Sequence, residues 1–197
     1  MSACRLAAHD LACRRGERVL FSGLNFALAA GEVLQLAGPN GVGKSSLIRI
    51  AAGLLRPLAG RIQREGAIAL LDEHPALEPH LPLGRALGFW RRFDRAEAAA
   101  LDHAVEALGL GDLLDVPVRF LSTGQRKRAA LARVLIAGAP VWLLDEPLNG
   151  LDTASAAAVE GLVADHCGRG GIALIASHQP FALVGMERLE LAAFEPA

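Results

Sequence analysis

The chain has 197 residues, of which 52% are hydrophobic and 21% are charged. This length predicts one domain with a buried core, and the composition excludes a disordered tail, a collagen-like repeat and a small disulfide-stapled protein. The 20 Lys and Arg residues and the 21 Asp and Glu residues give a net charge of −1. No nucleic-acid partner is therefore expected, because no overall basic charge is present to hold one.

The uncharged apolar stretches are too short to cross a bilayer. Residues 33–43 and 134–144 fall well below the roughly 18 residues that a spanning helix needs. Charged residues interrupt the first 18 positions, so no signal-peptide core is expected there. Cys4, Cys13 and Cys167 are far apart in the sequence, which predicts buried thiols in a reducing compartment rather than disulfides or a zinc site.

The first thirty residues contain short strand-like runs at 6–11, 19–21 and 24–28, with Gly16 and Gly23 at the predicted turns. They indicate an antiparallel β lobe. From residue 33 onward, short apolar runs at 33–37, 67–71, 141–144 and 172–176 alternate with helical segments. Such alternation predicts an α/β fold with a mainly parallel sheet.

A helix is predicted at 45–54, directly after the first of these apolar strands. A second helical region lies between the strand at 67–71 and residue 121. It opens with Pro75, Pro79 and Pro82, and helices are predicted at 83–93 and 96–108. We interpret this region as a small helical insert.

The glycine-rich stretch GPNGVGKSS at 38–46 matches the phosphate-binding pattern G-x-x-x-x-G-K-[ST] and lies between a predicted strand and a predicted helix. Glycines allow the backbone N–H groups to turn toward an anion at the N-terminus of the helix. We expect Lys44 to reach the β- and γ-phosphates of a nucleotide and Ser45 to bind Mg²⁺. The expected nucleotide-binding residues here are Gly38, Pro39, Asn40, Gly41, Val42, Gly43, Lys44, Ser45 and Ser46.

The apolar run at 141–144 leads into two adjacent carboxylates, Asp145 and Glu146. We expect Asp145 to hold Mg²⁺ opposite Ser45, directly or through water, and Glu146 to orient and deprotonate the attacking water. Alone, an Asp-Glu pair at a strand end is commonly a solvated turn. About a hundred residues after a phosphate-binding loop, it indicates a nucleotide hydrolase.

The segment LSTGQRKR at 121–128 does not indicate a function alone, because Ser122 could simply cap a solvated helix. The order of the motifs along the chain is more specific. A phosphate-binding loop is followed by L-S-x-G-Q, a strand ending in Asp-Glu-Pro, Leu151-Asp152 and a strand ending in Ser177-His178. This series, which spans nearly the whole chain, resembles an ABC-type ATPase domain.

The resemblance implies an α/β P-loop NTPase fold of ABC type, with a mainly parallel sheet core, an N-terminal antiparallel β lobe and a small helical insert. Residues 1–197 would form a single ABC ATPase domain. Within it, residues 1–73 and 121–197 would form the nucleotide-binding core with its β lobe, and residues 74–120 the helical subdomain.

The resemblance also implies ATP and Mg²⁺ as cofactors and a second copy of the chain as partner, in a head-to-tail pair closed over two ATP molecules. Ser122 and Gly124 of one copy, with Gln125 in the same motif, would bind the γ-phosphate held by Lys44 of the other. Asp152 would lie at the interface. His178 would contact the γ-phosphate, so the implied catalytic residues are Lys44, Glu146 and His178. A lone monomer would be a poor ATPase, since each half-site lacks donors until its partner supplies them.

A narrower resemblance rests on residues 17–41, on the short chain, and on the HP and HQP segments at 74–75 and 178–180. These features are similar to the haem-exporter ATP-binding subunits of bacterial cytochrome c maturation. This likeness implies a peripheral location at the cytoplasmic face of the bacterial inner membrane. It also implies integral membrane subunits, among cytochrome c maturation components, as partners. Their helices would dock at the helical insert, over residues 75–114.

The chain departs from the ABC pattern at two places. His74 stands where such domains carry a Gln that contacts Mg²⁺ and water, which predicts weaker or pH-dependent turnover. Arg15 stands near the position of the aromatic residue that commonly stacks on adenine, and we expect its guanidinium plane either to stack there or to be solvated. Thr123 replaces a small glycine in the signature, with little expected consequence.

Three alternatives remain at this point. The chain could be the ATPase subunit of a different ABC permease. It could instead be a poorly active nucleotide-binding structural subunit, a possibility that His74 leaves open. A protein acting on ribosomes or DNA is disfavoured, because such proteins carry tandem domains or basic arms.

Overall fold

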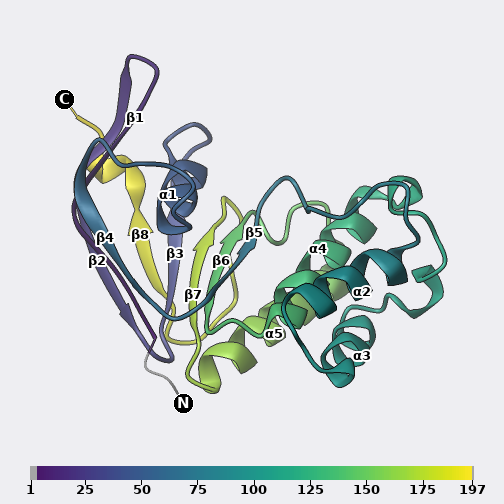
Figure 1. Cartoon of the computed structure of the whole chain (residues 1–197). Coiled ribbons are helices and arrows are strands. Elements are labelled where there is room, and N and C mark those ends of the chain that lie inside the picture. Colours follow the sequence, from purple (N-terminus) through teal and green to yellow (C-terminus); the bar gives the residue numbers. More distant parts are fainter. Residues whose placement is uncertain (1–3, 197) are drawn as a thin grey trace.

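The computed structural model describes residues 4–196. The domain predicted over residues 1–197 also includes residues 1–3 and 197, which lie outside the described range. Within it, two β-sheets and five α-helices are arranged as Figure 1 shows. The five-stranded sheet has the order β5-β6-β7-β3-β8, and its neighbouring strands are parallel. Its strands are β3 (Val33–Ala37), β5 (Ile68–Leu71), β6 (Val141–Asp145), β7 (Ile172–Ala176) and β8 (Glu187–Glu190). The predicted α/β fold with a mainly parallel sheet is confirmed.

The second sheet is antiparallel and has the order β2-β1-β4. Its strands are β1 (Arg5–Arg15), β2 (Arg18–Ala29) and β4 (Ala59–Glu65). The predicted β lobe is therefore present, with one correction. The turn at Gly16 is confirmed, but the turn expected at Gly23 is wrong, since that residue lies inside β2. The irregular pairing there is held by Asn25, whose side chain accepts from the Asp10 N–H (2.9 Å) and donates to the Gly23 carbonyl (2.9 Å).

The helices are α1 (Lys44–Ala51), α2 (Leu83–Phe93), α3 (Ala98–Ala107), α4 (Thr123–Ala137) and α5 (Thr153–Gly168). Short 3₁₀ turns lie at Gly111–Leu113, Val118–Phe120 and Leu191–Phe194. The prediction for α2 is confirmed, and that for α3 is right to within two residues at its start. Helix α1 ends three residues earlier than predicted. Arg64 of β4 donates there to the carbonyls of Ile50 (2.8 Å) and Ala51 (2.7 Å).

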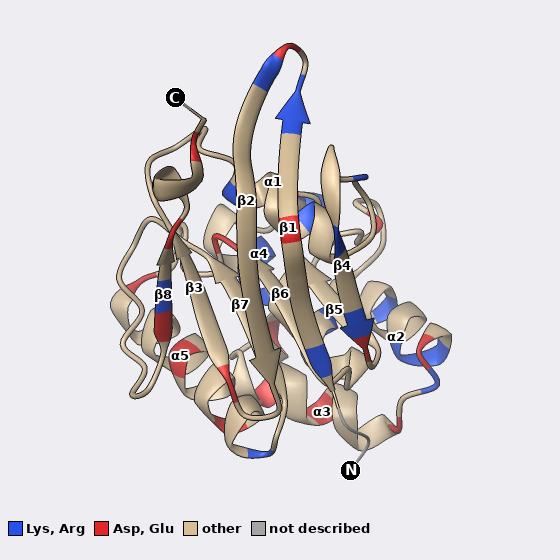
Figure 2. Cartoon of the chain, turned by 90° about the vertical axis from the view of Figure 1, so that its left-hand side faces the viewer, with Lys and Arg blue, Asp and Glu red and all other residues tan. Residues whose placement is uncertain are grey.

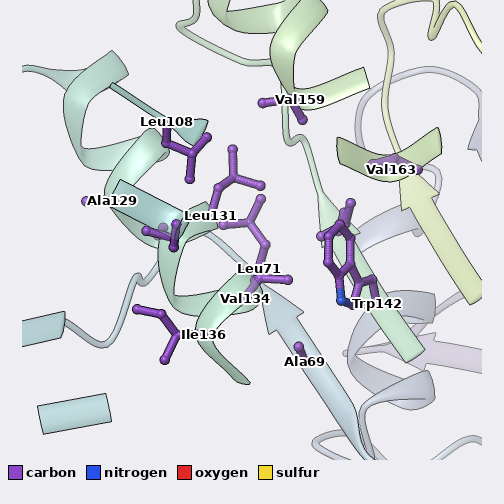
Figure 3. Packing of buried hydrophobic residues seen from close by; sticks show 14 of the residues in the cluster. Ala69, Leu71, Leu108, Ala129, Leu131, Val134, Ile136, Trp142, Val159 and Val163 are labelled. Atoms are coloured by element: carbon purple, nitrogen blue, oxygen red, sulfur yellow. The ribbon is translucent and has the colours of Figure 1, made fainter. Parts of the chain in front are cut away.

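Side chains of the parallel sheet alternate between two hydrophobic clusters, one on each face. On one face, Val141 and Leu143 pack with Leu47 and Ile48 of α1, which lies between the two sheets (Figure 1). On the other face, Trp142 shares a cluster with residues of α4 and α5. Figure 3 shows that cluster. Because both faces are covered, these strands can be uninterrupted apolar runs, which is why the sequence marks them clearly.

The parallel arrangement places the segments that follow β3, β6 and β7 at one edge of the sheet. Those segments contain the glycine-rich loop, Glu146 and Ser177-His178. Helices α2 and α3 lie together at the far side of α4 from the antiparallel sheet (Figure 1). Among the described residues, no helix is both long and apolar enough to cross a membrane.

Candidate active site

The glycine-rich loop leads directly into α1, and packing explains its last glycine. Gly43 has a φ of 113°, and a Cβ there would lie 3.1 Å from Cδ1 of Phe21. A side chain at this position would thus be strained and would press on the β2 hairpin. Gly43 provides no capping side chain, and the first turn of α1 contains no acidic residue. The N–H groups at this helix end are therefore available to an anion.

Lys44 has a buried side chain that folds back over the loop. Its Nζ donates to the carbonyls of Gly38 (2.8 Å) and Pro39 (3.1 Å). These two bonds hold the ammonium group above the loop whose N–H groups would surround a phosphate. The predicted contact of Lys44 with phosphates requires it to exchange these carbonyls for phosphate oxygens.

Asp145 ends β6 with a buried carboxylate beside the start of α1. Burial raises the pKa of this carboxyl, a hydrogen bond with the Ser45 side chain lowers it, and the neighbouring charges of Glu146 and Glu73 raise it. Its Oδ1 is buried and has no hydrogen-bond partner. A buried anionic oxygen without a donor is costly, so this atom points to a missing positive partner.

The donor set around Asp145 fits a magnesium ion. Ser45 and Asp145 provide two hard oxygen donors, of which the Asp145 Oδ1 is unpartnered. Within residues 4–196, no group of three or more His, Cys, Asp or Glu side chains is placed to hold a metal. Any cation here would take its remaining ligands from water or from a bound phosphate, which is the coordination that Mg²⁺ favours in nucleotide sites.

Glu146 and His178 form a direct pair at the same edge of the sheet. The Nδ1 of His178 lies 2.8 Å from Oε2 of Glu146. The His178 side chain is 45% exposed and the Glu146 side chain 24% exposed. Glu146 has a φ of 47°, which is uncommon for a residue with a side chain, and its N–H donates to the Ala176 carbonyl (2.8 Å). A strained backbone and a fixed partner hold this carboxylate in one orientation, open to solvent on one side.

The LSTGQ segment starts α4 through a capping box. Ser122 Oγ accepts from the Gln125 N–H (3.2 Å), and Gln125 Oε1 accepts from the Ser122 N–H (2.8 Å). The predicted N-cap role of Ser122 is confirmed. Gln125 was predicted as a nucleotide-binding residue, but its side chain is engaged in this local bond. The S-x-x-Q spacing of Ser122 and Gln125 is typical of a capping box, but this role for Gln125 was not predicted from it.

Gly124 packs against the loop that precedes α5. A Cβ at Gly124 would lie 2.8 Å from the carbonyl oxygen of Gly150, and a Cβ at Gly150 would lie 3.3 Å from Cγ2 of Thr123. Asp152, two residues further on, caps α5 by accepting from the Ser155 N–H (2.7 Å), and this hydrogen bond lowers the pKa of its carboxyl. The signature segment and the Asp152 segment are therefore neighbours within one chain.

His74 and Arg15 lie on different segments of the chain. His74 is exposed after β5, and its N–H donates to Asp72 Oδ1 (2.9 Å). Arg15 is exposed at the tip of the β1–β2 hairpin, where Figure 2 shows basic residues on both strands. The hairpin approaches the glycine-rich loop: burial raises the pKa of the Cys13 thiol, and the nearby Ser46 side chain lowers it. No contact in the structure assigns either His74 or Arg15 to a nucleotide.

Lys127 is a residue that the sequence reading missed. It lies on α4, its side chain is half-buried, and it lines a cavity of about 630 Å³ with Glu73 and His74. A lysine inside a basic run is expected to be solvated. Only the fold brings Lys127 near Asp145 and Glu146.

The chain is similar to known proteins over most of its length. Residues 21–149 match the family model described as ABC transporter. The chain is 58% identical, over the whole of both sequences, to the cytochrome c biogenesis ATP-binding export protein CcmA of Novosphingobium aromaticivorans. It is 53% identical to the CcmA of Sphingopyxis alaskensis, over 93% of this chain and 95% of that one.

Solved structures share the fold. A metal-chelate-type ABC transporter in an inward-facing conformation matches 95% of this chain and 80% of that chain, with a TM-score of 0.77 and 26% identity. An ABC transporter ATP-binding protein from Pyrococcus furiosus matches 98% of this chain and all of that chain, with a TM-score of 0.84 and 23% identity.

The close approach of Gly124 to Gly150 predicts a stability difference between two glycine variants. Gly124→Ala should lower the free energy of unfolding by about 1–3 kcal/mol, because the new Cβ meets a backbone carbonyl that cannot move aside freely. Gly161→Ala, inside α5 with open space around it, should raise it by about 0.5–1 kcal/mol. Urea denaturation measures both, and equal effects of the two variants would contradict the packing argument.

Proposed function

The chain belongs to the ABC transporter family, among its cytochrome c biogenesis ATP-binding export proteins, and we propose that it is the ATP-hydrolysing subunit of a membrane complex that exports haem for cytochrome c biogenesis. As a member of this family it is an ABC-type ATPase and binds nucleotide. The observation that carries the proposal is the convergence of the glycine-rich loop, Asp145 and the Glu146–His178 pair at one edge of the sheet.

Nucleotide binding is assigned to the loop at residues 38–46. Its N–H groups and the N-terminus of α1 would surround the phosphates, and Lys44 would leave the Gly38 and Pro39 carbonyls for the phosphate oxygens. Ser45 and Asp145 would hold Mg²⁺, and the bound ion would neutralise part of the phosphate charge. Arg15, at the tip of the adjacent hairpin, would stack on the adenine.

Hydrolysis is assigned to the Glu146–His178 pair. Glu146 would orient the attacking water and accept its proton at a carboxylate oxygen. His178 would keep that carboxylate oriented and contact the γ-phosphate. The 2.8 Å contact between them and the left-handed backbone of Glu146 support this assignment, because both restrict where the carboxylate can point.

A second copy of the chain would complete each site. Ser122 and Gly124 lie at the exposed start of α4, where the helix dipole favours negative charge. In a head-to-tail pair, this end of α4 would face the γ-phosphate held by Lys44 of the other copy. Asp152 would lie at the same interface, since its loop packs directly beneath Gly124.

Docking to integral membrane subunits is assigned to the helical subdomain, residues 74–120, and residues 1–73 and 121–197 would form the nucleotide-binding core. Phe89 and Phe93 of α2 are 51% and 68% exposed, and they stack beside Trp90. Phe89 and Trp90 line a groove of about 500 Å³, together with Ala86 and with Ala76, Leu77, Glu78, Pro79 and Leu81. An exposed aromatic groove suits an apolar helix of a membrane subunit, which would hold the chain peripherally at the cytoplasmic face of the inner membrane.

One observation favours a second candidate, a poorly active nucleotide-binding structural subunit. His74 replaces an amide in the segment after β5, it is exposed, and its N–H bonds only locally to Asp72. Nothing in the structure holds its ring toward Asp145. Turnover measurements distinguish this candidate from the ATPase.

Glu146→Gln should abolish turnover while sparing nucleotide binding. The amide cannot accept the proton of water, so ATP hydrolysis should fall by at least about 100-fold. With ATP bound but not consumed, the variant should accumulate as a dimer in light scattering. Glu106→Gln makes the same chemical change at an exposed position of α3 and should keep wild-type turnover. Unimpaired hydrolysis by Glu146→Gln would remove Glu146 as the base.

His74→Gln should raise turnover and flatten its pH profile between pH 6 and pH 8. A histidine side chain can gain a proton in this range, whereas an amide cannot. His80→Gln, at another exposed histidine six residues on, is the matched control. Superimposable pH profiles for wild type and His74→Gln would mean that position 74 takes no part in hydrolysis.

The haem assignment is tested by recovering partners from membranes. ATP-loaded Glu146→Gln, used as bait, should retain integral subunits and haem-handling proteins of cytochrome c maturation. Combining it with Phe89→Ser and Phe93→Ser should release the integral subunits, because the exposed aromatic surface beside the groove is lost. Recovery of an unrelated permease would leave the ATPase proposal in place and rule out haem export.

A further inference from the structure

The cavity beside α4 contains charged side chains that have no role in the proposed hydrolysis, Lys127 among them. It has a volume of about 630 Å³ and lies between the face of α4 that carries Thr123, Lys127 and Ala130 and the segment that follows β5. Asp72 and Glu73 line the opposite wall. The cavity therefore brings a cation of α4 and carboxylates of the sheet edge into one space.

Lys127 is surrounded by negative charge from two strands. Asp145 and Glu146 follow β6, Asp72 and Glu73 follow β5, and all four carboxylates act on the ammonium group. Burial lowers the pKa of Lys127, while these carboxylates raise it, Asp145 most strongly. Within residues 4–196, the ion pairs under 4 Å do not include Lys127. Its charge thus acts on the whole group rather than on one carboxylate.

We propose that Lys127 is a positioning residue that supplies the intrachain counter-charge for the carboxylates around the magnesium site and so couples the charge of that site to α4. The inference rests on the proposed Mg²⁺–ATP function. It follows from the cavity that Lys127 shares with Asp72 and Glu73, which directly follow β5, the strand paired with the Asp145 strand β6. It follows also from the unpartnered Oδ1 of Asp145, and from the place of Lys127 one turn after Thr123 on the helix that starts at the signature.

The coupling arises because Lys127 and a divalent cation beside Asp145 compete for the same negative charge. In a metal-free site, Lys127 offsets part of the repulsion between the carboxylates and the phosphates of ATP. With a divalent cation bound beside Asp145, the cation would supply most of that neutralisation, and Lys127 would contribute less. Lys127 should therefore make nucleotide binding less dependent on metal than the carboxylates alone would make it.

The affinity of a fluorescent, non-hydrolysable ATP analogue (methylanthraniloyl-AMPPNP) with and without Mg²⁺ tests this inference. The measured quantity is the ratio of Kd in EDTA to Kd in Mg²⁺, which a loss of packing would leave unchanged. Lys127→Met keeps the aliphatic stem and removes the charge. It should raise the ratio about fivefold at low salt, and less at high salt. Lys127→Arg should restore the wild-type ratio within about twofold.

Arg126→Met is the matched control, because it removes one positive charge from the adjacent exposed position of the same cavity wall. It should leave the ratio unchanged. An unchanged ratio in Lys127→Met, or an equal rise in Arg126→Met, would overturn the inference while leaving the ATPase proposal standing. Failure of the wild-type protein to bind the analogue at all would overturn both. Melting curves recorded for each variant establish that it is folded before its ratio is compared.

Discussion

Parallel pairing of β6 with β7, and of β7 with β3, is the constraint on which the candidate site depends. Asp145 is in register with Ala176, and Ala176 with Leu36, so the ends of three strands fall on one line. In sequence, the end of β3 lies more than a hundred positions before the end of β6, and the end of β7 lies 31 positions after the end of β6. Without this register, the glycine-rich loop, Asp145 and His178 would belong to unrelated turns of the chain. The register of the parallel strands therefore assembles the site, and each motif supplies only part of it.

The parts of the fold that could be predicted are those whose burial determines their composition. Strands β3 and β7 are covered on both faces, and their apolar runs predict their bounds. Strands β4 and β8 lie at sheet edges, are mostly exposed and carry charged residues, so no apolar pattern marks them. The bulge at Gly23 depends on a bond from Asn25 to Asp10 across two strands, which no local pattern contains.

The candidate site divides in the same way. Ser45, Asp145 and Glu146 belong to motifs whose spacing indicates their chemistry, and the fold brings Ser45 and Glu146 close to Asp145. The contact of Glu146 with His178 joins residues 32 positions apart and depends on the approach of two strand ends. Lys127 could not be recognised, since its significance comes from carboxylates on two other segments. Sequence thus predicts which groups are present, and the fold decides which of them act on one another.

The resting contacts of Lys44 bear on how fast nucleotide exchanges. Because its ammonium group already rests on the Gly38 and Pro39 carbonyls, the loop is shaped before a phosphate arrives. Capture then requires a swap of acceptors at one group rather than a refolding of the loop, so association is governed by diffusion and orientation. Differences between ATP and its products would then reside in their residence times.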